Sequence, residues 1–382
     1  MYIIGVSKND KYSEDWANNS AALSECLCHW FEKSKRELPW RAGDTTPWGI
    51  FISEIMLQQT TVPTALPYWH RFMDRFPTPQ SMATTSEDEI LAMWSGLGYY
   101  RRARNLRKAA QLMCESFGGD VPCTFEDIQA LPGVGRYTAG AVASFAFNLP
   151  VPIVEANTAR ALARIGAITN ISNDSELWEF AKALLPKDNP RLHNYAIMEL
   201  GAIVCKPTEP LCSQCPIAQF CKAKAQNLVA SIPPPKKAVE KLAIHYLAVA
   251  IQNGDKWLLR RIPTNEWHAG MMEFPKVEMN VTGMKSTKKN ASQSKALKQL
   301  SEQLHMDCCR KAVYRKTVKY VVTNHSITLE VWMAQTDTQS IRMNREQEGL
   351  FWIATDELDK YPYGSAMRRI ILTIIKEAKE NR

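Results

Sequence analysis

Four cysteines within one short segment constrain this chain more than any other feature of its sequence. They lie at Cys205, Cys212, Cys215 and Cys221 with the spacing Cys-x6-Cys-x2-Cys-x5-Cys, and prolines interrupt the segment, so we expect a loop. Four thiolates in one loop can converge on a [4Fe–4S] cluster. They also suit a tetrahedral zinc ion, although zinc sites usually contain two Cys-x2-Cys pairs and this segment contains one. The spacing therefore favours a cluster and leaves zinc as the alternative.

Length and charge set the broad class of the protein. A chain of 382 residues is too long for one ordinary core, so we expect two domains. The net charge of +8 permits an anionic partner such as nucleic acid without requiring one. The N-terminal residues lack the apolar core of a signal peptide, and no apolar run reaches membrane-spanning length, so no membrane partner is expected. The other six cysteines have no disulfide-like spacing, which indicates a reducing compartment: a bacterial cytoplasm near the nucleoid, or a eukaryotic nucleus or mitochondrion.

Periodicity and a proline-rich segment divide the chain into two parts. From Ser20 to about Leu228 the apolar residues recur at helical spacing, and no strand is predicted there. Residues 230–241 contain Ser-Ile-Pro-Pro-Pro-Lys-Lys, which predicts a stiff, basic linker. We therefore expect a mainly helical domain over residues 1–229 and a second domain over residues 242–382.

The second part has the pattern of an α+β domain. Asn253-Gly254 lies between two apolar runs and predicts a β-hairpin over residues 242–262, and a second hairpin is expected over residues 313–334. Isoleucines at helical spacing predict a final helix near the C-terminus. The lysine-rich stretch over residues 284–298 is expected to form a mobile loop.

A glycine turn in the first part is typical of DNA-binding helical hairpins. Gly133 and Gly135 lie in Leu-Pro-Gly-Val-Gly before a predicted helix, where their backbone N–H groups could hold a phosphate. Such a turn alone could be an ordinary connection between helices. Together with the cysteine segment and with Val-Glu-Ala-Asn at residues 154–157, it resembles the helix-hairpin-helix, iron–sulfur class of DNA glycosylases, and within it the MutY family of adenine glycosylases.

The resemblance implies a fold and a partner. It is dense from Trp30 to Cys221 and looser in the C-terminal third. It implies two helical lobes with an adenine pocket in the cleft between them, an iron–sulfur loop at residues 205–221, and a C-terminal Nudix-like domain that recognises 8-oxoguanine. The expected partner is double-stranded DNA with adenine opposite 8-oxoguanine or guanine, bound by a monomer.

Removal of adenine requires two carboxyl groups in opposite protonation states, one to protonate the base and one to stabilise the sugar cation. Glu54 lies among the apolar residues 51–57, which should raise its pKa and suits a general acid. Periodicity alone would place Glu54 on an exposed helix face. The match of residues 56–60 to the family motif Met-Leu-Gln-Gln-Thr instead implies that it is the proton donor.

Glu155 is the second carboxylate, and here the chain departs from the family. The family motif is Val-Asp-Gly-Asn, and glutamate lengthens the side chain by about 1.5 Å. We expect the backbone to compensate, so that Glu155 still stabilises the cation; an inactive site is the alternative. Asn157 is predicted to be the N-cap of the following helix.

Other positions of the first part match residues that line the family's sugar and adenine pockets. Related bifunctional glycosylases carry a lysine where this chain has Tyr137, and a phenol cannot form their Schiff base, so we expect base removal without strand cleavage. The resemblance implies that Tyr137 and Asn157 line the sugar pocket. It also implies that Arg36, Trp40 and Glu199 hold the flipped adenine.

Residues 94–100, Trp-Ser-Gly-Leu-Gly-Tyr-Tyr, contain the family's Gly-Leu-Gly-Tyr-Tyr motif. An enzyme that acts on a base must unstack it, and an inserted side chain offsets the lost stacking. The resemblance implies that Tyr99 intercalates beside the opposing base and that Gln59 fills the gap, with Leu97 and Thr60 as further DNA contacts. Without the resemblance, core packing would explain the tyrosines.

The second domain resembles the Nudix fold through Gly-Met-Met-Glu-Phe-Pro at residues 270–275. A working Nudix site needs a glutamate-rich helix for magnesium, and here the corresponding helix offers only Glu302, so we expect recognition without hydrolysis. The family's Phe-Ser-His loop is replaced by Thr323-Asn324-His325. Asn324 and His325 can still hydrogen-bond an oxidised guanine, but the phenylalanine contact is missing.

The sequence thus predicts an adenine DNA glycosylase. Two alternatives are kept. An endonuclease III-like pyrimidine glycosylase is opposed by Tyr137 and by the Nudix-like domain. A lesion-binding protein with little or no turnover is favoured only by the substitution at Glu155.

Overall fold

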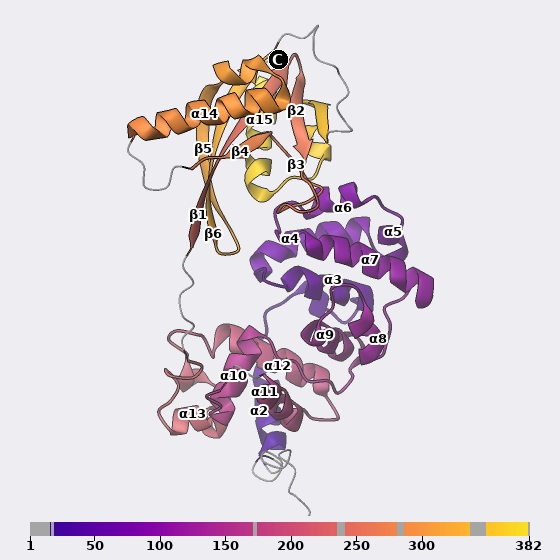
Figure 1. Ribbon diagram of the computed structural model, residues 1–382. Helices are drawn as coiled ribbons and strands as arrows, with labels where there is room; N and C mark the ends of the chain where they lie inside the picture. Colours follow the sequence, from indigo (N-terminus) through magenta and orange to yellow (C-terminus); the bar gives the residue numbers. More distant parts are fainter. Residues whose placement is uncertain are drawn as a thin grey trace, which may run out of the picture. The chain divides into compact units, whose positions relative to one another are not determined.

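The computed structural model describes residues 16, 19–170, 174–234, 241–280, 286–336 and 349–380. The chain forms two compact units (Figure 1). The first comprises Met1–Thr84 and Asn105–Lys237, and the second comprises Thr85–Arg104 and Ala238–Arg382. Within the described ranges, no helix is both long and apolar enough to cross a membrane.

The first unit is helical, and residues 19–170 and 174–234 contain no strand. Its helices are α2 (Ser20–Ser34), α3 (Pro47–Leu57), α4 (Val62–Arg75), α5 (Pro79–Ala83), most of α7 (Arg101–Ser116), α8 (Phe125–Ala130), α9 (Arg136–Phe147), α10 (Ala156–Gly166), α11 (Ser175–Leu184), α12 (Pro190–Ile203) and α13 (Lys222–Ala225), with short 3-10 turns η2 (Pro39–Arg41), η3 (Cys212–Gln214) and η4 (Ala218–Phe220).

Two local features place the helices that carry the site. Helix α3 is apolar around its circumference and buried along most of its length, as expected of a helix inside a core. Its N-terminus is capped by Thr46, whose side chain accepts from the Gly49 N–H. Helix α12 approaches the start of α10 closely, because Gly201 has no side chain; a Cβ there would lie 2.7 Å from the Asn157 carbonyl oxygen.

The second unit is a mixed sheet between two helices. The strands are β1 (Leu242–Asn253), β2 (Lys256–Arg261), β3 (Met272–Glu273), β4 (Lys276–Glu278), β5 (Val313–Val322), β6 (His325–Gln335) and β7 (Leu350–Ala354), and the helices are α6 (Glu87–Trp94), α14 (Ser286–Leu304) and α15 (Ser365–Glu380), with 3-10 turns η5 (Asp307–Lys311) and η7 (Leu358–Lys360). The sheet order is β3-β2-β1-β6-β5, with β4 on β1 and β7 on β2. β1 and β6 are parallel, and both predicted hairpins, β1–β2 and β5–β6, are confirmed.

Alternate residues of β1 enter two hydrophobic cores, one on each face of the sheet. Leu247 and Val249 belong to the core beneath α14, whereas Ala248 and Ala250 belong to the core beneath α15 (Figure 1). The predicted architecture, a helical region followed by an α+β domain, is therefore confirmed.

Residues 284–298 and the expected linker differ from what the sequence predicted or are only partly described. The stretch over residues 284–298 was expected to be a loop, but α14 begins at Ser286; its lysines and alanines favour helix, and Leu297 anchors it in the core. The expected linker, residues 230–241, contains the point at which the two units divide, and residues 235–240 of it lie outside the described ranges.

The segment Thr85–Arg104 was assigned to the helical part by sequence, yet it packs with the second unit. The Ser95 hydroxyl and the Tyr100 hydroxyl both donate to the Tyr363 carbonyl oxygen, at 2.8 and 2.9 Å. The Arg261 guanidinium makes two 3.0 Å hydrogen bonds to the Asp88 carboxylate. α6 is thus held by the side chain of Arg261, and the turn after it is held by the Tyr363 carbonyl oxygen.

Candidate active site

Glu54 lies inside the first unit, on helix α3. Its side chain is buried, with 3% of the residue exposed. Burial raises the pKa of Glu54 from 4.5 to about 7; the hydrogen bond from Tyr137 and the positive charge of Arg41 oppose this rise, and the negative charge of Glu155 adds to it. Close to neutral pH, a substantial fraction of Glu54 therefore holds its proton.

Tyr137 lies in the first turn of α9 and faces Glu54. Its hydroxyl donates to Glu54 Oε2 at 3.2 Å. Burial, and then the charges of Glu54 and Glu155, raise the pKa of Tyr137 well above its ordinary value, so the phenol remains a hydrogen-bond donor. This bond orients the Glu54 carboxyl group, while the side chain of Tyr137 stays partly exposed.

Glu155 is the N-cap of α10. Its Oε1 accepts from the backbone N–H groups of Asn157 at 2.8 Å and Thr158 at 3.0 Å, and the Glu155 N–H donates to the Thr158 hydroxyl at 2.8 Å. The expectation that Asn157 is the N-cap is therefore wrong, because the longer side chain of Glu155 folds back onto the helix end. Two N–H donors at a helix N-terminus stabilise a negative carboxylate.

The predicted adenine-binding residues form a second charged group. Arg36 and Arg41 both hydrogen-bond the fully buried Glu199, with Arg36 Nη2 and Arg41 Nη2 each 2.9 Å from Oε2. Burial alone would raise the pKa of Glu199, but the hydrogen bond from Arg36 and the charge of Arg41 outweigh it and hold the pKa below its ordinary value. Trp40 is buried beside them, edge-on to Trp69.

Arg41 was not singled out from the sequence. Its guanidinium lies over the rings of Phe31 and Tyr195, and its charge reaches Glu54. Its Nε atom is buried and has no acceptor among the residues that the structure describes. A donor of this kind is ready for an incoming polar group. The only local signal was its place beside Trp40.

Arg160 is a second residue that the sequence analysis missed. It is nearly buried on α10, and its Nη2 donates to Asn157 Oδ1 at 2.9 Å and to the Gly201 carbonyl oxygen at 2.7 Å. Its Nε donates to the Cys205 carbonyl oxygen at 2.8 Å. One side chain therefore connects the predicted sugar-pocket residue Asn157 to the first cysteine of the loop.

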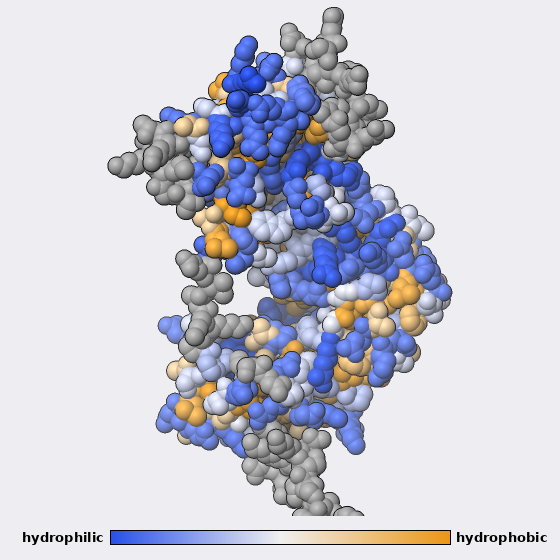
Figure 2. Space-filling view, viewed as in Figure 1, coloured by the Kyte–Doolittle hydropathy of each residue, from blue (hydrophilic) through white to orange (hydrophobic). Residues whose placement is uncertain are grey.

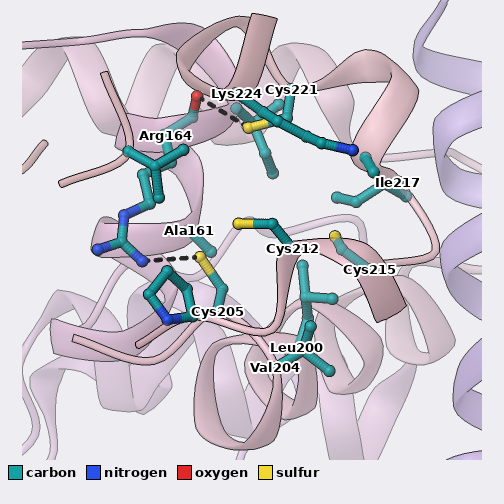
Figure 3. A pocket seen from close by; sticks show the side chains of 14 residues that line it. Ala161, Arg164, Leu200, Val204, Cys205, Cys212, Cys215, Ile217, Cys221 and Lys224 are labelled. Atoms are coloured by element: carbon teal, nitrogen blue, oxygen red, sulfur yellow. Dashed lines mark hydrogen bonds between the residues drawn. The ribbon is translucent and has the colours of Figure 1, made fainter. Parts of the chain in front are cut away.

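The four cysteines line one cavity (Figure 3). Their sulfur atoms point into it from η3, from the segment after α12 and from the start of α13, and Leu200, Val204 and Ile217 form its apolar walls. The space free of protein atoms is about 410 Å³, part of it open to solvent. Arg164 Nη1 donates to Cys205 Sγ at 3.4 Å.

The chemistry of the donor set bears on the metal group that this cavity could hold. The four side chains are all thiols, and four cysteine ligands are what a [4Fe–4S] cluster takes. An all-sulfur set also suits a tetrahedral zinc ion, so zinc stays the alternative. Among the described residues, no three His, Cys, Asp or Glu side chains are grouped so that they could hold one metal ion.

The predicted DNA contacts of the first unit lie on turns. Gln59 is exposed in a left-handed conformation, with φ of 57°, and Thr60 beside it is partly buried. Gly133 has φ of 81°, and a side chain there would collide with Asn105. Gly135 is the N-cap of α9, and space beside it is open. The turn thus presents backbone at a helix N-terminus, as predicted.

Within the second unit, the two predicted DNA contacts of the motif at residues 94–100 differ in exposure. Tyr99 is 50% exposed and has φ of 49°, a conformation that is unusual for tyrosine and often found at functional sites. Leu97 is only 6% exposed and lies in the core. A DNA contact by Leu97 stays a prediction.

Asn324 and His325 lie at the β5–β6 turn. Thr323 before them has φ of 52°, in the left-handed region that a β-branched residue rarely adopts. Its hydroxyl is 3.5 Å from His325 Nδ1. His325 also contacts the ring of Trp267, with the ring centroids 4.7 Å apart.

Comparison with known proteins now identifies the family. The chain matches the model of the HhH-GPD superfamily base excision DNA repair proteins over residues 52–187 and that of the NUDIX domain over residues 246–373. It is 36% identical over 275 residues to the adenine DNA glycosylase of Buchnera aphidicola subsp. Schizaphis graminum, covering 70% of this chain and 78% of that protein. The chain belongs to the adenine DNA glycosylase family. The predicted resemblance to the MutY family is thereby confirmed.

Other members of this adenine DNA glycosylase family are longer. The adenine DNA glycosylase of Rattus norvegicus is 39% identical over 272 residues, which cover 67% of this chain and 51% of that protein. This chain therefore spans about half the length of that relative. A solved thermostable thymine-DNA glycosylase shares the helical fold, with 28% identity and a TM-score of 0.51 over 56% of this chain and 100% of that chain.

Proposed function

We propose that this protein releases adenine from double-stranded DNA in which the adenine is opposite 8-oxoguanine or guanine. The observation that carries the proposal is the pairing of a buried glutamate with a pKa of about 7, Glu54, with a helix-capping carboxylate, Glu155, close enough for the two charges to interact. The family membership supports the same reaction, since the relatives are named adenine DNA glycosylases.

The chemistry follows from these two groups. Glu54 donates its proton to a ring nitrogen of the flipped adenine, the bond between N9 and the sugar C1′ breaks, and the base departs as neutral adenine. The sugar is left as an oxocarbenium-like cation, which the negative charge of Glu155 stabilises. Water then adds to C1′, and its proton returns to a carboxylate. The Tyr137 hydroxyl keeps Glu54 in place throughout.

We assign adenine recognition to Glu199 and the residues around it. Arg36 and Arg41 hold Glu199 charged, and the aromatic ring of Trp40 is buried next to Arg41 in the sequence. The unpaired Nε donor of Arg41 suits a ring nitrogen of the base. Tyr137 takes the place of a Schiff-base lysine, so the reaction leaves the strand uncut.

DNA contacts are divided between the two units. In the first unit, Gly133, Gly135, Gln59 and Thr60 would meet the duplex; in the second, Tyr99 would insert beside the opposing base. Glu302 is the one acidic residue of α14 and pairs with Lys298, which supports lesion recognition without Nudix hydrolysis. A monomeric state and a reducing compartment remain predictions.

The cavity of Cys205, Cys212, Cys215 and Cys221 would hold a [4Fe–4S] cluster, with Arg164 beside Cys205 as a positive neighbour. The cluster would supply a fixed anchor for the loop. Through Arg160, that anchor would also keep Asn157 and the start of α10 in position.

Single-turnover assays test the proposed reaction. Duplexes that pair adenine with 8-oxoguanine, guanine or cytosine are incubated with excess protein, and free adenine and strand breaks are measured separately. We expect adenine release opposite 8-oxoguanine and guanine, with the strand intact until alkali is added. Release of a pyrimidine, or binding without release of any base, would establish one of the two alternatives instead.

A further inference from the structure

An exposed tryptophan in the second unit stands beside the candidate lesion loop. Trp267 lies in the connection between β2 and β3, and 42% of its surface is exposed. Its ring centroid is 4.7 Å from that of His325, with the ring planes tilted by 53°. The sequence analysis did not use Trp267. An aromatic surface at this place is what the loop lacks, because Thr323 occupies the family's phenylalanine position.

The connection that carries Trp267 is held at both ends. The Gly270 N–H donates to the Ile262 carbonyl oxygen at 2.7 Å, and the Ile262 N–H donates to the Met271 carbonyl oxygen at 2.8 Å. Within it, Glu266 pairs with Arg260 at 2.6 Å. The indole is thus presented on an ordered loop, so little conformational entropy would be lost when a base stacks on it.

Another exposed apolar side chain lies beside the same turn. Leu242 is 54% exposed and pairs with His325 across β1 and β6, so the two side chains lie on the same face of the sheet. We call Trp267 and Leu242 the Trp267 patch. Figure 2 shows hydrophobic surface at this end of β1 and β6. Exposed apolar groups gathered around a strained turn usually mark a binding site.

The patch is connected to the predicted wedge within the same unit. His268, next to Trp267, lies edge-on to Tyr100, with ring centroids 5.6 Å apart. Tyr100 follows the exposed Tyr99. Trp267 and Tyr99 therefore lie on two segments of the second unit that pack against each other.

We propose that Trp267 is the stacking surface for the base opposite the target adenine, an oxidised guanine, and that it replaces the missing phenylalanine of the loop. The inference rests on the proposed function, because it assigns a residue to the same DNA complex. A purine lying on the indole would turn its edge toward Asn324 and His325, whose side chains can donate and accept hydrogen bonds. Every base has a stacking face, so Trp267 supplies affinity while the two polar side chains supply discrimination.

Three variants test this assignment: Trp267→Ala, Trp267→Phe and, as a control, Tyr314→Ala. Tyr314 is 48% exposed on β5, at the end of the strand away from the turn. Binding is measured to duplexes with an uncleavable adenine analogue opposite 8-oxoguanine, guanine or an abasic site. Circular dichroism melting confirms that each variant is folded.

Opposite 8-oxoguanine, we expect Trp267→Ala to weaken binding about tenfold, because stacking on one base contributes that much. Trp267→Phe should stay within about threefold of wild type, and Tyr314→Ala should match it. Opposite an abasic site, Trp267→Ala and wild type should bind equally, since no base is present to stack.

Three results would overturn the assignment: unchanged binding by Trp267→Ala, an equal loss opposite the abasic site, or a wild-type dimer that Trp267→Ala disperses in sedimentation. The binding assay is independent of catalysis. If wild type releases no adenine but the base-dependent loss is found, the proposed function fails and the stacking site stands. If wild type releases adenine and Trp267→Ala binds like wild type, only the stacking site fails.

Discussion

Helix α3 and the N-terminus of α10 each hold a glutamate of the candidate site, and the two carboxyl groups have opposite surroundings. Glu54 is buried in the interior, and this burial raises its pKa to about 7 although a phenol donates a hydrogen bond to it. Glu155 caps a helix and accepts two hydrogen bonds from backbone N–H groups. The place of a glutamate in the fold, more than its residue type, sets the surroundings of its carboxyl group.

The same comparison bears on the substitution at residue 155. The family's aspartate is a good N-cap, and glutamate is an unusual one. Here the extra methylene is accommodated because the side chain turns back to Asn157 and Thr158. The carboxyl group therefore stays at the helix end, where the proposed stabilisation of the sugar cation needs it.

The largest effect is expected from removing the proton donor. Glu54→Gln should lower the single-turnover rate of adenine release about 1,000-fold, because general acid catalysis typically contributes 10² to 10⁴. Binding of the uncleavable duplex should change by less than about threefold, since the amide keeps the shape of the side chain. Glu32→Gln, an exposed change on α2, is the matched control. A loss below about tenfold would mean that another group protonates adenine.

A smaller loss is expected at the other carboxylate. Glu155→Gln removes the charge but keeps an oxygen for the cap, and should slow adenine release about 100-fold. Glu155→Asp keeps both the charge and the capping oxygen, so this variant should release adenine at least as fast as wild type. The same single-turnover assay measures both variants. Full activity of Glu155→Gln would show that no charge is needed there.

The pH dependence separates the two environments. Adenine release should fall about tenfold per pH unit above pH 7, because the required proton on Glu54 is lost there. The folded state binds more protons than the unfolded state between pH 4.5 and about 7. The free energy of unfolding of wild type should therefore decrease over this interval relative to Glu54→Gln. Urea titrations of both proteins measure it, and parallel curves would contradict the raised pKa.

The smallest effect concerns the cap itself. Glu155→Ala should lower the free energy of unfolding by about 1 kcal/mol, the usual cost of losing an N-cap acceptor. Glu155→Gln should lower it less, because the amide oxygen can still accept from the backbone. Thermal melts compare the two variants. Equal stability of Glu155→Ala and wild type would show that the two hydrogen bonds contribute nothing to folding.

Local patterns predicted much of the fold. Asn253-Gly254 placed the first hairpin correctly, because the turn type sets the register of both strands. The helix at the start of α14 was not predicted, because the many lysines there indicated a solvated loop. Leu297 holds this helix by packing into the core on the sheet, and the local sequence does not show that contact. Local patterns also could not predict that Thr85–Arg104 belongs to the second unit. Ser95 and Tyr100 hydrogen-bond a carbonyl oxygen that is more than 260 residues away in the sequence.

Local patterns likewise predicted only part of the candidate site. Glu54, Tyr137 and Glu155 lie in recognisable motifs, and the structure brings them together. Arg41 and Arg160 carry no motif. Their roles come from buried partners distant in sequence, such as Glu199, which is 158 residues from Arg41. Short-range patterns contain no information on such pairs.

The most direct test of this account is the pKa of the Glu54 carboxyl group in the folded protein. It can be followed by NMR of the side-chain carboxyl carbons of isotopically labelled glutamate, with Glu54→Gln to assign the signal. We expect Glu54 to titrate at about pH 7. A midpoint near the ordinary value of 4.5 would leave Glu54 charged at neutral pH, without the proton that the departing adenine requires.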